Sequence, residues 1–208
     1  MQKWIRKAAR SLAAAQGADQ SREDVIAYGL TALCQMGAIL LGALLIGLAA
    51  DMVWECLLIY LVVGTFRKCT GGAHAPSLLG CILTSLLTIG AMAGLARYLL
   101  APRLTPLAAS LCLLAFAWIW WIIVRRVPVD SPNKPIRRPE KIRRLRRQSF
   151  VYAGVCTLVC AGTAAAYWLR PLPPPALSLY TSLILALCWQ SFTLTAPAGV
   201  LLCCRGGK

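Results

Sequence analysis

The chain has 208 residues, of which 59 % are hydrophobic and 14 % are charged, and its formal net charge is +15. Its charged residues cluster between long apolar runs instead of following a helix or strand period, which excludes an ordinary soluble domain. We expect an all-α polytopic membrane protein whose single domain covers residues 1–208. No soluble domain is left to bind nucleic acid, so the excess of cations indicates positive-inside bias and attraction to anionic lipids.

The N-terminal segment, residues 1–24, is predicted to hold an amphipathic helix lying on the membrane surface. Apolar residues recur at helical spacing on the side opposite the cations: Trp4, Ile5, Ala8 and Leu12. This pattern is typical of an interfacial helix. No apolar run follows the basic residues closely enough for a signal peptide.

Six apolar segments follow, and each is a predicted transmembrane helix. They cover about 25–50, 52–66, 76 or 77 to 100, 104–124, 150–169 and 176–202. The second is short for a full span. Four spans therefore fall within 25–124, a basic loop occupies 125–148, and two spans and a short tail make up 149–208.

The distribution of Lys and Arg predicts the orientation of these spans. With the N-terminus inside and six crossings, the cytoplasmic segments hold 19 of the 22 cations. These segments are 1–24, 67–75, 125–148 and 203–208. The positive-inside rule therefore places both termini in the cytoplasm, together with the loop 67–81.

That loop contains the only histidine of the chain, His74, seven residues before Cys81. Imidazole is the usual base for a catalytic thiol. In one continuous helix the two residues would stand about 10 Å apart, too far for proton transfer. Two glycines before His74 allow the chain to reverse, and Pro76 suits a first helical turn. We expect His74 to fold back over a helix start that has Cys81 in its first or second turn, where the helix N-terminus favours a thiolate.

Other interpretations of these residues remain open at this point. The pair could be a buried thiol and an unrelated interfacial histidine. Cys69, His74 and Cys81 give three zinc ligands without a fourth, so we expect no metal and no cofactor. Cys69, beside Lys68, is a competing nucleophile that we expect in an open loop. Most of the other cysteines lie in apolar runs, where a free thiol behaves as a small hydrophobe, and we expect no structural disulfide.

A third member of a catalytic group would come from the cytoplasmic loop 125–148. Asp130 or Asn133 could orient the imidazole, although either could simply cap a turn. Asp51 and Glu55 are expected near the outer side, away from Cys81. The basic part of the loop, 137–147, could form a surface helix.

Two motifs resemble the accessory gene regulator B (AgrB) family. The first is Gly71-Gly72-Ala73-His74-Ala75 followed by Cys81, and the second is the proline-rich stretch 128–135. Chain length, number of spans and motif order also fit. The resemblance implies a multi-pass cysteine endopeptidase of the bacterial cell membrane that matures a quorum-sensing pro-peptide, with His74 as base and Cys81 as nucleophile. It also implies a homodimer.

The family's substrates have an amphipathic leader, a short signal segment and an acidic C-terminal tail. The resemblance therefore implies that the tail is cut off through a peptidyl thioester, which a substrate cysteine or serine then converts to a ring. We expect cytoplasmic cations to bind the tail, namely Arg67, Lys68, Arg137, Arg138, Arg143, Arg144, Arg146 and Arg147.

Two classes without enzymatic activity compete with this interpretation. A small transporter or peptide-export component would use Gln35, Glu55 and Gln190 along a pathway and Cys81 for packing. A receptor-like scaffold would use its basic loop to bind lipids or partners.

Overall fold

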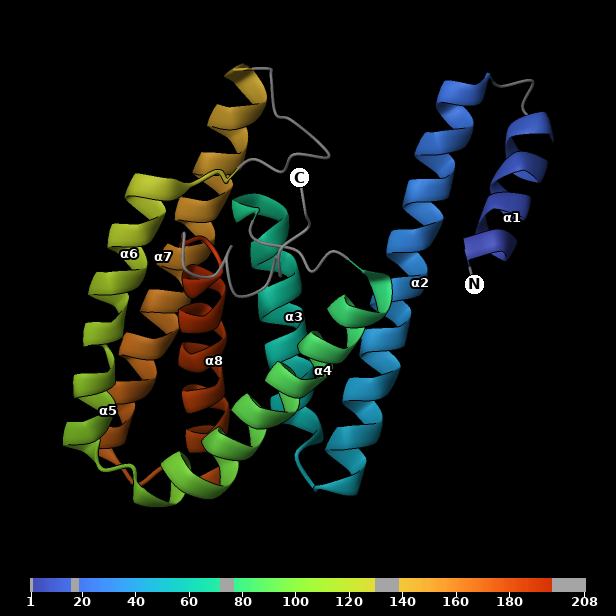
Figure 1. The fold of residues 1–208 in the computed structure, drawn as a ribbon. Helices are drawn as coiled ribbons and strands as arrows, with labels where there is room; N and C mark the ends of the chain where they lie inside the picture. Colours follow the sequence, from blue (N-terminus) through green and yellow to red (C-terminus); the bar gives the residue numbers. More distant parts are fainter. Residues whose placement is uncertain (1, 16–18, 72–76, 130–138, 196–208) are drawn as a thin grey trace. The chain divides into compact units, whose positions relative to one another are not determined.

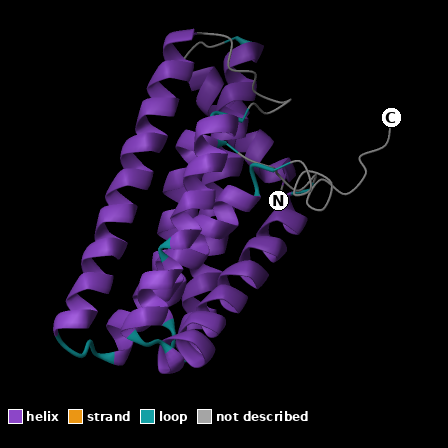
Figure 2. Cartoon of the chain, turned by 90° about the vertical axis from the view of Figure 1, so that its left-hand side faces the viewer, coloured by secondary structure: helices purple, strands orange, loops and turns teal. Residues whose placement is uncertain are grey.

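The computed structural model describes residues 2–15, 19–71, 77–129 and 139–195. The regular elements among these residues are all helical, as Figures 1 and 2 show, which confirms the predicted all-α class. Two compact units divide the chain, residues 1–42 and residues 43–208. The catalytic candidates all belong to the second unit.

The first unit contains α1 (Gln2–Ala15) and the larger part of α2 (Gln20–Ala49). The Nε of Arg10 donates to Glu23 Oε1 at 3.0 Å, which joins the two helices. The predicted N-terminal helix is therefore present.

The apolar residues of α1 divide between a buried stripe and an exposed one, and exposure of Trp4 and Leu12 leaves them available to a membrane surface, as predicted for an interfacial helix. Ile5, Ala9 and Ala13 are buried, whereas Trp4 and Leu12 are 77 % and 46 % exposed. The two sets form neighbouring stripes along the helix, because each repeats every four residues. Small alanine side chains allow close packing, and the bulky residues are left facing outward.

Five helical segments of the described chain are long and apolar enough to cross a membrane: Arg22–Ala49, Leu78–Arg103, Pro106–Arg126, Pro139–Leu169 and Pro174–Phe192. They correspond to five of the six predicted spans and support a polytopic membrane protein. The remaining predicted span forms a helix, α3 (Val53–Thr70), that is not in this set. Its 18 residues include three charged ones, Glu55, Arg67 and Lys68.

Two of these five segments consist of more than one helical element. The second joins α4 (Leu78–Gly94) to a π-helical stretch, η1 (Leu95–Leu100), and a short 3-10 helix, η2 (Ala101–Arg103). The third consists of α5 (Pro106–Cys112) and α6 (Leu114–Arg126). Figure 1 shows α4 inclined to α3 and α8.

Two helices run further than the sequence pattern predicts. α3 continues through Thr70, so Arg67, Lys68 and Cys69 lie on its last turn and not in a loop. α7 (Pro139–Leu169) is one helix of 31 residues. The described part of the basic stretch, for which a surface helix was one possibility, is therefore continuous with a span. Because the cations at the end of α3 and at the start of α7 belong to these helices, their positions around the helix axis are fixed relative to the apolar residues of the same helix.

The innermost of the candidate spans is α8 (Pro174–Phe192). In its apolar stretch 61 % of the residues are buried, whereas the share is 17–28 % in the other four candidate spans. A helix enclosed by protein can carry polar side chains that lipid-facing helices avoid. Accordingly, α8 buries six polar residues: Ser178, Thr181, Ser182, Tyr180, Gln190 and Ser191. α8 thus provides the polar contacts that hold both ends of α3.

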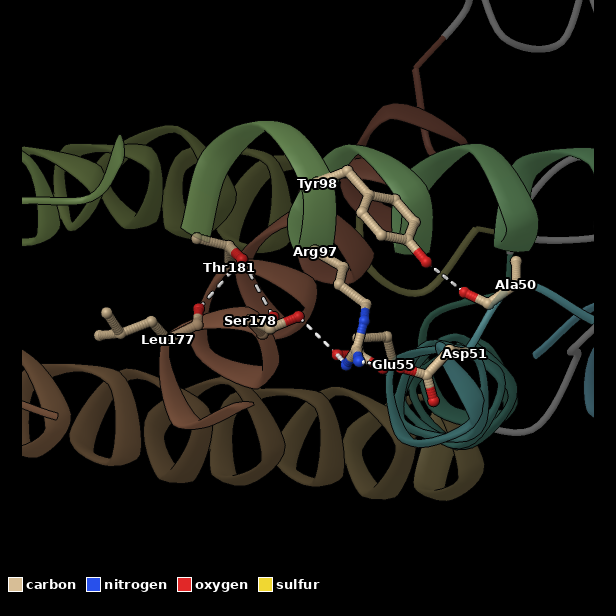
Figure 3. A network of polar contacts seen from close by, with 8 residues as sticks. All are labelled: Ala50, Asp51, Glu55, Arg97, Tyr98, Leu177, Ser178 and Thr181. Atoms are coloured by element: carbon tan, nitrogen blue, oxygen red, sulfur yellow. Dashed lines mark hydrogen bonds and ion pairs between the residues drawn. The ribbon is translucent and has the colours of Figure 1, made fainter. Parts of the chain in front are cut away.

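The first of these contacts is a charged cluster at the start of α3 (Figure 3). Glu55 is 1 % exposed, and its Oε1 accepts from Arg97 Nη1 at 3.0 Å and from Ser178 Oγ at 2.6 Å. Arg97 also contacts Asp51 Oδ2 at 2.6 Å. The hydroxyl of Tyr98 donates to the carbonyl of Ala50. Glu55 thereby joins α3 both to the π-helical stretch η1 and to α8.

Candidate active site

Cys81 lies where the first turn of α4 closes. Ser77 is the N-cap, and its side chain accepts from the backbone N–H of Gly80 at 3.0 Å. The N–H of Cys81 donates to the carbonyl of Ser77 at 2.9 Å. The predicted place of Cys81 in the first or second turn is confirmed, because the helix begins at Leu78; Pro76 lies outside the described residues. The side chain is 8 % exposed.

Arg67 carries a positive charge close to that sulfur. It lies on the last turn of α3, beyond the apolar run that ends at Phe66. Burial lowers the pKa of the Arg67 guanidinium, and the neighbouring Cys81 raises it. The two side chains are therefore within electrostatic reach of each other.

Cys69 is the competing thiol, and its surroundings differ. It lies on the last turn of α3 instead of in an open loop, and its Sγ contacts Gln148 Oε1 at 3.9 Å. Burial raises the pKa of the Cys69 thiol, an effect that Lys68 opposes. A thiol with a raised pKa is a poorer nucleophile at neutral pH.

The chain leaves α3 through a tightly held turn. The Gly71 backbone has a φ of 77°, which lies in the left-handed region that favours glycine. The N–H of Val129 donates to the Thr70 carbonyl at 2.9 Å. A β-carbon at position 71 would lie only 2.2 Å from the carbonyl oxygen of Val129. Only glycine fits this approach of the two backbones.

Gln190 of α8 completes this turn. Its Nε2 donates to Thr70 Oγ1 at 3.0 Å and to the Gly71 carbonyl at 2.9 Å, and the residue is fully buried. Sequence reasoning placed Gln190 only on the pathway of the transporter alternative. The feature of the sequence that could have pointed to this role is that Gln190 is a single amide side chain near the end of an apolar run.

These contacts bring the described ends of the two motifs together. Residues 72–76 follow Gly71, and residues 130–138 follow Val129. The two residues that precede these stretches, Gly71 and Val129, are therefore in contact. Five predicted site residues lie in them and fall outside the described residues: His74, Asp130, Asn133, Arg137 and Arg138.

The four remaining predicted tail-binding arginines lie on the first turns of α7 and have different surroundings. Arg144 and Arg147 line a cavity beside Cys69. Arg146 instead lies over the ring of Phe150, and its Nη2 donates to the carbonyl of Val124 on α6 at 3.3 Å. Arg143 is exposed. The sequence pattern alone treated all four as one cluster.

The chain was compared with known proteins. The model of the family described as accessory gene regulator B matches residues 5–194. Two relatives from Clostridium perfringens are each 25 % identical to the chain, and each alignment covers 88 % of the chain and 86 % of the relative. The one from strain 13 is provisionally named AgrB-like protein 2, and the one from strain SM101 AgrB-like protein.

No solved structure was found to match the chain. The family match covers more than half of the chain, spans both motifs, and implies involvement in accessory gene regulator peptide processing. The chain therefore belongs to the accessory gene regulator B family.

Proposed function

We propose that this protein is a membrane-embedded cysteine endopeptidase that removes the acidic C-terminal tail of a quorum-sensing pro-peptide and closes the remaining peptide into a ring. The observation that carries the proposal is the position of Cys81. It lies at a helix N-terminus, with the Arg67 charge beside it and the turn that leads to His74 held by Gln190. Both the helix N-terminus and the cation attract negative charge.

The first half of the reaction is an acyl transfer. His74 takes the proton from Cys81, and the sulfur attacks the carbonyl at the end of the signal segment. The backbone N–H groups of Leu78 and Leu79 precede the first internal bond of α4, so they are available to the oxyanion. His74 then protonates the leaving amine, and the acidic tail departs from a peptidyl thioester on Cys81.

The second half closes the ring. A cysteine or serine of the substrate attacks the thioester carbonyl, and Cys81 leaves as a thiolate that regains its proton. Exchange of one thioester for another changes the free energy little, so the ring forms only if water is kept away. Burial of Cys81 supports this requirement.

The finer features of the proposal rest on the motifs. Asp130 follows Val129, which bonds the turn before His74, so Asp130 or the nearby Asn133 is proposed to orient the imidazole. The distribution of cations supports cytoplasmic termini and a cytoplasmic active site in the bacterial cell membrane. A homodimer is proposed from the family alone.

Co-expression with a pro-peptide tests the activity. Cys81→Ala is expected to abolish cleavage while the protein still accumulates in the membrane. Cys69→Ala is the matched control, because it removes the neighbouring thiol, and cleavage should persist. Unchanged cleavage by Cys81→Ala would refute the proposal.

A further inference from the structure

A cavity of about 560 Å³ lies beside the last turn of α3 and the first half of α7. Cys69 contributes from α3, and the α7 side is formed mainly by Arg144, Arg147, Val151, Tyr152 and Val155. Its volume is within the range of pockets that bind small molecules. The acyl transfer proposed for Cys81 uses none of these side chains, although the sequence led us to expect Arg144 and Arg147 to bind the acidic tail of the substrate.

One end of the cavity is cationic. Arg144 and Arg147 are three residues apart on α7, so they share a face of the helix, and both are exposed. Among the residues that the structure describes, neither has a carboxylate within ion-pair distance. The only acid in α7 is Glu140, one turn before Arg144. The two charges are therefore free to bind an anion from outside the chain.

The rest of the cavity is apolar and extends along the span. Val151 and Val155 are 59 % and 54 % exposed, and Tyr152 lies between them. From Arg147 to Val155 the helix rises about 12 Å, toward the middle of the membrane-spanning segment 139–169. A ligand that fits both ends needs an anionic group joined to an apolar chain.

We propose that this cavity binds one anionic phospholipid. Its phosphate lies between the guanidinium groups of Arg144 and Arg147, which match phosphate oxygens in geometry and charge. One acyl chain lies along Val151 and Val155. An acidic peptide would match the arginines but would leave the valines uncovered. The proposal does not depend on the peptidase activity.

Cys69 lines the cavity and provides a reporter for the test. The protein is placed in nanodiscs of phosphatidylcholine, with or without phosphatidylglycerol, and treated with N-ethylmaleimide. Because the chain has ten cysteines, labelling is assigned to Cys69 by peptide mass spectrometry. We expect phosphatidylglycerol to slow labelling of Cys69 several-fold. Cys56 is fully buried and should stay unlabelled wherever the protein is folded.

Two double variants separate the cavity from general charge. Arg144→Gln with Arg147→Gln should lose the protection, since each arginine near an anionic surface contributes about a fivefold change in affinity, or about 25-fold for two. Arg143→Gln with Arg146→Gln removes the same charge outside the cavity and should keep the protection. Val155→Trp fills the apolar end and should make labelling insensitive to lipid while both arginines remain.

Three results would overturn the proposal. They are equal protection by phosphatidylcholine alone, equal loss in the two double variants, and protection by a free hexaglutamate peptide in phosphatidylcholine discs that matches the effect of phosphatidylglycerol. The last result would assign the arginines to an acidic peptide instead of a lipid.

Discussion

The side-chain amide of Gln190 donates to the Gly71 carbonyl at 2.9 Å, and so fixes the point where the chain leaves α3 toward His74. The contact joins the innermost helix to the start of the loop that carries the proposed base. It has no counterpart in the sequence pattern, because 119 residues separate its partners. The geometry of the loop therefore depends on α8, which has no predicted role in the chemistry.

Gln190→Leu is predicted to impair processing of the pro-peptide strongly. The buried Thr70 hydroxyl would lose the donor that Gln190 supplies, and the Gly71 carbonyl would keep only the Thr70 hydroxyl as a donor, at a cost of about 1–3 kcal/mol. The matched control is Ser191→Ala, because the buried Ser191 hydroxyl has no hydrogen-bond partner among the described residues. Cleavage is measured by mass spectrometry at equal membrane levels of each variant. Equal losses in both variants would contradict the role of Gln190.

Gly71→Ala is predicted to abolish processing. A β-carbon there would collide with the Val129 carbonyl, and the positive φ is strained for alanine. Gly64→Ala is the control on the same helix, since a β-carbon at that position meets nothing within 4 Å. Full activity of Gly71→Ala would show that Val129 does not lie against this turn.

Arg67→Gln is predicted to slow alkylation of Cys81 by iodoacetamide at neutral pH about tenfold, because the cation that interacts with the sulfur is lost. Arg67→Lys should restore part of the rate. Lys68→Gln removes a charge from the exposed neighbouring position and should change the rate little. The rate is followed by peptide mass spectrometry. An unchanged alkylation rate in Arg67→Gln would show that Arg67 does not influence the reactivity of Cys81.

Arg97→Gln is predicted to lower thermal stability in detergent markedly. The buried carboxylate of Glu55 would lose its only cation among the described residues, and breaking one side of a buried ion pair costs about 3–5 kcal/mol. Asp51→Asn should cost less than about 1 kcal/mol, because the Asp51 side chain is 93 % exposed. Similar melting temperatures for the two variants would contradict the buried role of Glu55.

The features that were predictable from sequence are local ones. Long apolar runs indicate membrane helices wherever they occur, and Pro76 and Ser77 mark the helix start that places Cys81. The end of α3 was missed because Arg67 and Lys68 resemble loop residues when only hydropathy is considered. Their charges are tolerated there because the last turn lies beyond the apolar run.

The remaining features depend on contacts between distant segments. The pairing of Thr70 with Val129 and the contact of Gln190 with Gly71 each need the folded bundle. The different surroundings of Arg144 and Arg146 follow from the register of α7, in which the described part of the basic stretch is continuous with the span.

The covalent intermediate tests the central claim most directly. The purified protein is incubated with a pro-peptide whose ring-closing cysteine or serine is replaced by alanine, so that the thioester accumulates. Intact-protein mass spectrometry should show an adduct of the peptide without its acidic tail, mapped to Cys81, released by hydroxylamine and absent from Cys81→Ala. An adduct on another cysteine, or tail release by Cys81→Ala, would contradict the account.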